Sequence, residues 1–135
     1  MSVLMRLRRS LSRTFTELLS ATELHRETRF HITLPASEFT NDAEKRALLV
    51  GETLTVQGVM DCVYRRADGK LILLDYKTDR LTREELNDRM LARERLVARH
   101  GEQLSYYVKA CVSLFGQTPD EVLIYSLPLG DSIKL

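Results

Sequence analysis

Hydrophobic residues recur at steps of three and four over residues 3–22, which predicts an amphipathic helix at the start of the chain. Arginines at positions 6, 8, 9 and 13 lie mostly off the apolar stripe. We interpret them as the solvated side that any amphipathic helix needs, with a DNA-contacting face as the alternative. The apolar stripe consists of Leu4, Leu7, Leu11, Phe15, Leu18 and Leu19.

The next part of the chain is typical of strands rather than helices. Residues 26–34 alternate loosely between apolar and polar and end at a proline, whereas residues 36–46 are polar and irregular and predict a loop or insertion. Residues 48–66 are enriched in β-branched side chains, and Ala67-Asp68-Gly69 is a favourable hairpin turn. The continuously apolar residues 71–74 predict a central strand covered on both faces.

Two helices are expected after this strand. Residues 82–98 are rich in Glu, Arg and Leu, and Thr82 with Glu85 has the spacing of a capping box. We expect Gly101 to break this helix and a second helix to cover residues 102–115.

The end of the chain returns to strands. Gly116 marks a helix stop, residues 122–127 predict a strand, and residues 132–135 predict an edge strand. The order of helix, three strands, helices and strand predicts an α/β fold with a central mixed sheet, built on a β-meander and flanked by helices.

Length and charge limit the classes of function. The 135 residues suit a single domain spanning positions 1–135. With 20 Lys and Arg against 19 Asp and Glu, the net charge of +1 argues against a stand-alone nucleic-acid binder with a strongly basic face. Cys62 and Cys111 lack metal or redox spacing, which indicates a reducing, cytoplasmic location. Neither a run of membrane length nor a secretory signal occurs, so no membrane partner is expected.

The candidate chemistry lies on the two strands that the predicted hairpin connects. Strand alternation places Asp75 and Lys77 on one face, and Asp61 lies near the end of the preceding strand. Two carboxylates and an ammonium group at one place suit metal-assisted cleavage of a phosphodiester, because Mg²⁺ prefers oxygen ligands and needs few of them. The backbone carbonyl of Tyr76 is a further candidate ligand. An ordinary ion pair on an edge strand is the alternative, but a central strand does not readily bury an unpartnered charge.

Lys77 has several possible roles at such a centre. It could orient the attacking water or stabilise charge on the phosphorane, and a general-base role is also open. We favour positioning and electrostatic stabilisation as its main contribution.

The order of these motifs resembles the PD-(D/E)XK nuclease superfamily. The similarity is most specific to the RecB-like nuclease domain at the C-terminus of AddA-type helicase–nuclease subunits, and it runs from about residue 21 to the end. The residues that carry it are Arg26-Glu27, Phe30, Gly58-x-x-Asp61, Asp75-Tyr76-Lys77-Thr78-Asp79 and Gln103-Leu104-x-x-Tyr107. Asp-Tyr-Lys alone is a weak signal, whereas the three motifs in this order are a strong one.

The resemblance implies a restriction-endonuclease-like core and a Mg²⁺-dependent DNA exonuclease, with Mn²⁺ as a possible substitute. It places Gln103 at the rim of the site, in contact with Lys77, water or DNA, and Tyr107 beside it. Glu27 matches a recurrent family position, although pairing with a neighbouring arginine is an equally supported role. The implied partners are single-stranded DNA, a helicase motor domain of the same polypeptide and a second helicase–nuclease subunit, which together serve double-strand break repair and recombination.

Two departures from the family pattern stand out. A metal-ligating histidine usually comes from a Gly-Thr-x-x-His segment before the first strand, and this chain has none, so the chain is either a fragment or has lost that ligand. His100 replaces a common aromatic residue. We expect His25, His31 and His100 to be structural or exposed, and Thr78 and Asp79 to shape the turn after the strand.

Two alternatives to the helicase–nuclease assignment remain open. One is a free-standing repair or phage-type nuclease of the same superfamily. The other is a catalytically inactive DNA-binding or scaffold module.

Overall fold

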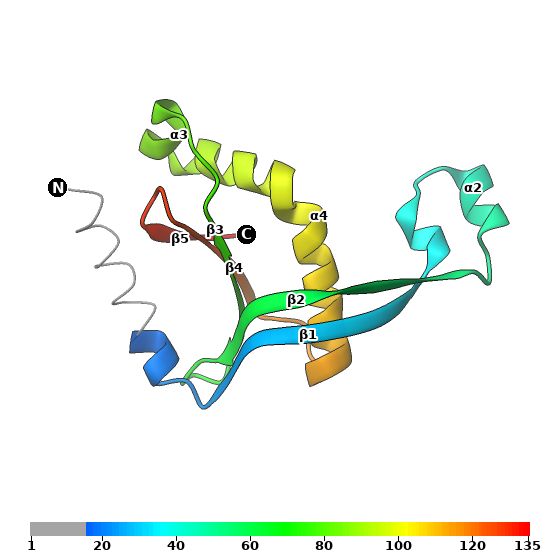
Figure 1. The fold of residues 1–135 in the computed structure, drawn as a ribbon, viewed down its shortest axis with the longest axis horizontal. Coiled ribbons are helices and arrows are strands. Elements are labelled where there is room, and N and C mark those ends of the chain that lie inside the picture. The colour runs from blue at the N-terminus through cyan, green and yellow to red at the C-terminus, as the bar shows by residue number, and fades with distance from the viewer. Residues whose placement is uncertain (1–15) are drawn as a thin grey trace.

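The centre of the protein is a five-stranded sheet whose strands lie side by side in their order along the chain (Figure 1). The computed structural model describes residues 16–135, so most of the helix expected over residues 3–22 lies outside the described residues, although residues 16–19 are helical. The strands are β1 (Glu23–Pro35), β2 (Thr53–Arg65), β3 (Leu71–Lys77), β4 (Glu121–Ser126) and β5 (Asp131–Lys134).

The sheet is mixed, as predicted. Strands β1, β2 and β3 form an antiparallel meander, β3 and β4 are parallel, and β5 is antiparallel to β4 at the edge. A parallel pair requires a long crossover, and the helices α3 (Arg83–Asn87) and α4 (Arg89–Phe115) provide it. The predicted α/β class, with helices flanking a central mixed sheet, is therefore confirmed. Within residues 16–135, no helix is long and apolar enough to cross a membrane.

The central strand β3 is covered on both faces, as its continuous apolar run predicts. Leu71 and Leu73 pack on the side of α4, and Ile72 and Leu74 pack on the opposite side. All four side chains are fully buried. The first side includes Phe30, Met60, Val63, Leu96, Leu104, Tyr107 and Ile124, and the second includes Leu18, Cys62, Tyr64 and Tyr125.

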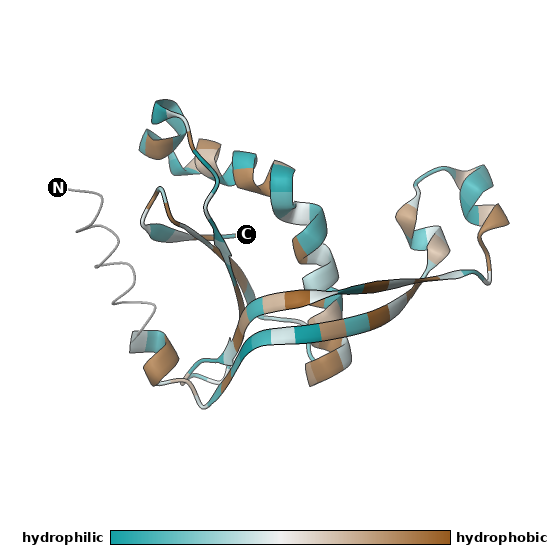
Figure 2. Ribbon diagram, viewed as in Figure 1, coloured by the Kyte–Doolittle hydropathy of each residue, from teal (hydrophilic) through white to brown (hydrophobic). Residues whose placement is uncertain are grey.

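A two-stranded arm extends from the sheet (Figure 1). The pairing of β2 with β3 ends at Cys62 opposite Leu74, whereas the pairing of β1 with β2 continues to Pro35 opposite Thr53. We call the part of this hairpin that no longer pairs with β3 the arm; on β2 it runs from Asp61 back to Thr53. Hydrophobic and hydrophilic residues alternate along it (Figure 2), as expected for strands with one face packed and one face in water.

The end of the arm corrects one prediction. The segment 36–46, expected as a loop or insertion, is not irregular: it contains the 3-10 helix η1 (Ala36–Phe39) and the start of α2 (Ala43–Leu48). Asp42 caps α2, because its side chain accepts hydrogen bonds from the backbone N–H groups of Glu44 and Lys45. The polar composition that suggested a loop therefore reflects an exposed, capped helix.

The helical region corrects two further predictions. The capping box of Thr82 and Glu85 is present, but α3 ends at Asn87 and Asp88 caps a new helix, so residues 82–98 are not one helix. Gly101 does not break α4, which continues through it to Phe115. The predicted stop at Gly116 is confirmed, since this residue adopts the left-handed conformation with φ 69°.

Candidate active site

The site forms where β2 and β3 separate. Their last paired residues are Cys62 and Leu74, so the next positions in register would be Asp61 and Asp75. Backbone pairing between β2 and β3 stops there, and a side chain bridges the two strands instead: Asp61 Oδ2 accepts a hydrogen bond from the backbone N–H of Tyr76 at 2.9 Å. The fold thus brings together the two carboxylates that the sequence motifs singled out.

Asp75 is a buried carboxylate with incomplete compensation. Its exposed fraction is 3%, and Lys77 Nζ lies 2.8 Å from its Oδ2 atom. This contact is an ion pair without the direction of a good hydrogen bond, and Oδ2 has no other partner among the described residues. Burial, reinforced by the Asp61 side chain and opposed by Lys77, raises the pKa of Asp75 to about 6. A cation beside Oδ2 would supply the missing compensation.

Lys77 links the strand to the long helix. Its Nζ donates a hydrogen bond to Gln103 Oε1 at 3.0 Å, while it also contacts Asp75. Alternation on β3 aims both Asp75 and Lys77 at α4, and Gln103 meets them from that helix. The structure therefore joins the predicted strand motif to the predicted helix motif through one ammonium group.

Tyr107 supports this wall of the site. It is buried one turn after Gln103, and its ring packs edge-on against Phe30 with centroids 5.4 Å apart. Gly58 makes this packing possible, because a Cβ atom there would lie 3.0 Å from Phe30 Cζ. The glycine of the Gly-x-x-Asp motif thus has a steric role.

Glu27 occupies an irregular position opposite Asp61. The residues on either side pair regularly, Arg26 with Cys62 and Thr28 with Met60, but the Glu27–Asp61 pair is absent from the ladder. Glu27 has φ 47°, which is uncommon for a residue with a side chain. Among the described residues Glu27 shows no ion pair with an arginine, so the structure gives no support to the arginine pairing that was one of its two possible roles.

A pocket of about 470 Å³ opens at this irregularity. Arg26, Glu27, Asp61, Cys62 and Tyr76 line it. Glu27 therefore lies close to the candidate metal ligands, and its role in the site stays a prediction.

The donor atoms fit a hard divalent cation. Asp61 and Asp75 supply carboxylate oxygens, and burial together with the neighbouring Asp61 leaves the Asp75 charge only partly compensated by Lys77. Residues 16–135 contain no group of three or more His, Cys, Asp or Glu side chains arranged to hold a metal ion. The Tyr76 carbonyl as a further ligand stays a prediction.

Sequence reasoning missed a connection made by Asp79. Asp79 Oδ2 lies 2.9 Å from Arg99 Nη1, and its Oδ1 lies 2.9 Å from His100 Nε2. Asp79 therefore does more than shape the turn: it ties the segment after β3 to α4 one turn before Gln103. The sequence carried no local signal for this connection, because Arg99 and His100 lie 20 and 21 residues after Asp79.

The fold and the site together define a class of protein. A mixed sheet that presents two aspartates and a lysine at the point where two strands separate has the arrangement expected of a phosphodiester-cleaving nuclease. The chain belongs to the PD-(D/E)XK nuclease superfamily, which it matches over residues 2–131.

Individual relatives narrow the similarity further. The chain is 45% identical over 94 residues to the AddA-type ATP-dependent helicase/nuclease subunit of Bacillus velezensis, which covers 70% of this chain and 7% of that protein. The protein of the same name from Acetivibrio thermocellus is 35% identical over 108 residues, covering 80% and 8%. The one from Clostridium acetobutylicum is 30% identical over 120 residues, covering 89% and 9%. These similarities confirm the predicted AddA-type resemblance, and the chain spans less than a tenth of the length of these relatives.

Proposed function

We propose that this chain is a Mg²⁺-dependent exonuclease module that hydrolyses single-stranded DNA, with Mn²⁺ as a possible substitute. The observation that carries the proposal is the buried Asp75 carboxylate, 2.8 Å from the Lys77 ammonium group, with the Asp61 carboxylate beside it. Buried charges persist in proteins where a partner or a metal compensates them, and here the protein supplies only part of that compensation.

Each side chain has a distinct role in this proposal. Asp61 and Asp75 would hold the cation, which would supply polarisation of the scissile phosphate and a lowered pKa of a bound water. Lys77, held between Asp75 and Gln103, places its ammonium group where it can orient that water and stabilise the developing charge. Gln103 is exposed at the rim and fixes Lys77 through its amide oxygen.

The larger setting is also part of the proposal. The relatives are named as ATP-dependent helicase/nuclease subunits, and this chain matches only 7–9% of their length. We therefore place the chain in a single nuclease domain of a larger helicase–nuclease that acts in double-strand break repair and recombination. Its partners would be a motor domain of the same polypeptide and a second subunit, in the cytoplasm.

Degradation of end-labelled single-stranded DNA tests the catalytic proposal. The protein is assayed with Mg²⁺, with Mn²⁺ and with a chelator, beside Asp75→Ala. We expect metal-dependent cutting that falls at least about a thousandfold in the variant, because metal assistance contributes several kcal/mol to the rate.

Asp68→Ala is the matched control, since it removes an exposed aspartate of the hairpin turn and should leave cutting unchanged. Equal cutting by wild type and Asp75→Ala would contradict the assigned site. DNA binding without cutting in any metal would favour the inactive DNA-binding module instead.

A further inference from the structure

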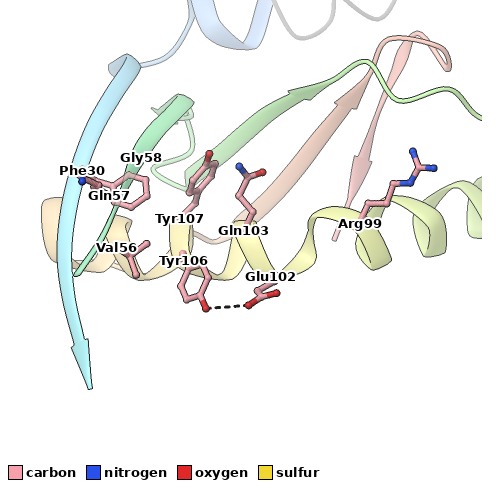
Figure 3. A pocket seen from close by; sticks show the side chains of 9 residues that line it. All are labelled: Phe30, Val56, Gln57, Gly58, Arg99, Glu102, Gln103, Tyr106 and Tyr107. Carbon is pink, nitrogen blue, oxygen red and sulfur yellow. Dashed lines mark hydrogen bonds between the residues drawn. The ribbon is translucent and has the colours of Figure 1, made fainter. Parts of the chain in front are cut away.

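A second pocket lies between the arm and α4, with Gln103 among its lining residues (Figure 3). Its volume of about 400 Å³ falls within the range of small-ligand sites. Residues of β1 and β2 form one wall and residues of α4 form the other. The lining residues are Phe30, Val56, Gln57, Gly58, Arg99, Glu102, Gln103, Tyr106 and Tyr107.

The chemistry of this pocket suits a flat, neutral, hydrogen-bonding group. Phe30, Tyr106 and Tyr107 contribute aromatic rings, and Gln57 and Gln103 contribute amide groups. The charges do not favour a phosphate, because Arg99 is paired with Asp79 at 2.9 Å and Glu102 adds a carboxylate. A nucleobase combines a ring face for stacking with an edge of hydrogen-bond donors and acceptors.

Tyr106 is the residue best placed to meet such a base. It is only half-buried, in contrast to Phe30 and Tyr107. Its ring stacks on Phe39 with centroids 5.6 Å apart, and its hydroxyl donates a hydrogen bond to Glu102 Oε1 at 3.3 Å. These contacts hold the ring in place before any ligand binds, which lowers the entropy lost on binding.

Gln103 connects the pocket to the candidate active site. Gln103 lines the pocket and also accepts the hydrogen bond from Lys77, so one side chain borders both spaces. A strand whose phosphate lies at Asp75 would therefore have a neighbouring base within reach of the pocket.

We propose that this pocket binds one unpaired nucleobase of the DNA strand, stacked on Tyr106, next to the phosphate to be cleaved. The inference rests on the proposed nuclease function and adds a contact to a base beside the phosphate to be cleaved. A base within a duplex is paired and stacked and would have to leave the helix to enter, which costs a few kcal/mol. The pocket thus favours single strands over duplexes.

Binding measured without metal separates this inference from catalysis. The probe is a fluorescent oligothymidine, compared by anisotropy with an oligonucleotide of equal length that carries abasic residues. We expect Tyr106→Ala to weaken binding of oligothymidine about ten- to a hundredfold, the range of one lost base–aromatic stack. Wild type should bind the abasic strand about as weakly as Tyr106→Ala binds oligothymidine. Tyr106→Ala should lose little further affinity for the abasic strand.

Two variants separate base contact from a merely structural role. Tyr106→Phe keeps the ring and should restore most of the affinity. Phe39→Ala removes the same ring stack from outside the pocket, so it should reduce affinity far less than Tyr106→Ala. Equal losses of affinity in Tyr106→Ala and Phe39→Ala would overturn the proposed base site. An equal loss of affinity for both oligonucleotides in Tyr106→Ala would overturn it as well.

The failures are distinguishable. Base-dependent binding without cutting in any metal would sustain the pocket and contradict the nuclease. The base-binding proposal would fail if wild type cut abasic strands as readily as strands that carry bases, or if it did not bind oligothymidine. The nuclease proposal would then be decided by the degradation assay alone.

Discussion

At the scale of single residues, the motif Asp75-Tyr76-Lys77-Thr78-Asp79 divides into two tasks. Asp75 and Lys77 point toward α4 and meet each other and Gln103, whereas Asp79 reaches the same helix one turn earlier. Both contacts constrain the position of Gln103 relative to β3. We therefore regard Asp79 as a positioning residue that acts through α4 rather than at the phosphate.

Replacing Asp79 by Asn should lower the free energy of unfolding at neutral pH. Burial works to raise the pKa of Asp79, but the contacts with Arg99 and His100 outweigh it and hold the pKa below its ordinary value. Loss of these charge-assisted contacts is expected to cost about 1–3 kcal/mol, measured by urea unfolding. Asp68→Asn, at an exposed turn, should have a much smaller effect.

The effect of Asp79→Asn should also depend on pH. A carboxylate with a depressed folded-state pKa contributes its full stability above the unfolded value of about 3.9 and loses it as the pH falls through the folded-state pKa. The difference between wild type and Asp79→Asn should therefore close on acidification. A difference that stays constant from neutral to acidic pH would show that the carboxylate charge is not responsible.

The sequence could identify some residues of the candidate site but not their tertiary partners. Asp75 and Lys77 could be paired because strand alternation fixes which side chains share a face. Asp61 could be singled out by its place near the end of the preceding strand, and Gln103 by the family resemblance. The partners of Asp79 could not, since they depend on how an irregular segment lies against a helix twenty residues further on. Likewise, no local pattern indicates that Glu27 adopts a positive φ.

At the scale of elements, the predicted helix boundaries after β3 were wrong where they relied on local sequence patterns alone. Asp88 follows a helical pattern without interruption, but a short acidic side chain forms a cap more readily than it continues a helix, so α3 ends and α4 begins there. Gly101 fails to break α4 because the flanking residues Leu96 and Leu104 are buried against the sheet. Tertiary packing of this face outweighs the modest helix cost of one glycine.

Replacing Gly101 by Ala should therefore stabilise the protein by about 0.5–1 kcal/mol, because it removes backbone freedom within a continuous helix. The added Cβ would meet only Val97 Cγ1 at 3.5 Å, an ordinary contact. Gly58→Ala is the opposite case, since its Cβ would lie 3.0 Å from Phe30 Cζ, and it should destabilise by about 1–3 kcal/mol. Thermal unfolding of both variants measures the contrast, and destabilisation by Gly101→Ala would contradict it.

At the scale of the whole molecule, the order of strands could be predicted but the arm could not. The meander and the edge strand follow from hairpin and turn signals near each other in the chain. How far each strand stays paired depends on contacts between distant residues, and β2 leaves β3 at Cys62 while it stays with β1 to Thr53. The candidate active site lies at this fork, where the separation of β2 and β3 frees Asp61 for Tyr76 and leaves Asp75 paired with β4 but not with β2.

The fork also predicts how stability varies across the molecule. Strand β3 has neighbours on both sides and fully buried side chains, whereas the arm is two-stranded and its tip exposes Leu48 and Val50 at 82% and 76%. A two-stranded hairpin is marginal unless it packs on something else. Contacts with α4 supply that support, through the Phe39–Tyr106 stack and the Lys109–Glu38 ion pair at 2.7 Å.

Hydrogen–deuterium exchange should therefore show fast exchange at the tip of the arm, slower exchange at its base and the slowest exchange in β3. Phe39→Ala should speed exchange in the arm and leave β3 unchanged, because the lost contact holds only the arm to α4. Acceleration of β3 to the same extent would show that arm and sheet unfold as one unit. Addition of oligothymidine without metal should slow exchange at the base of the arm if a base enters the pocket beside Tyr106, since the ligand would then bridge the arm and α4 and stabilise the less stable of the two.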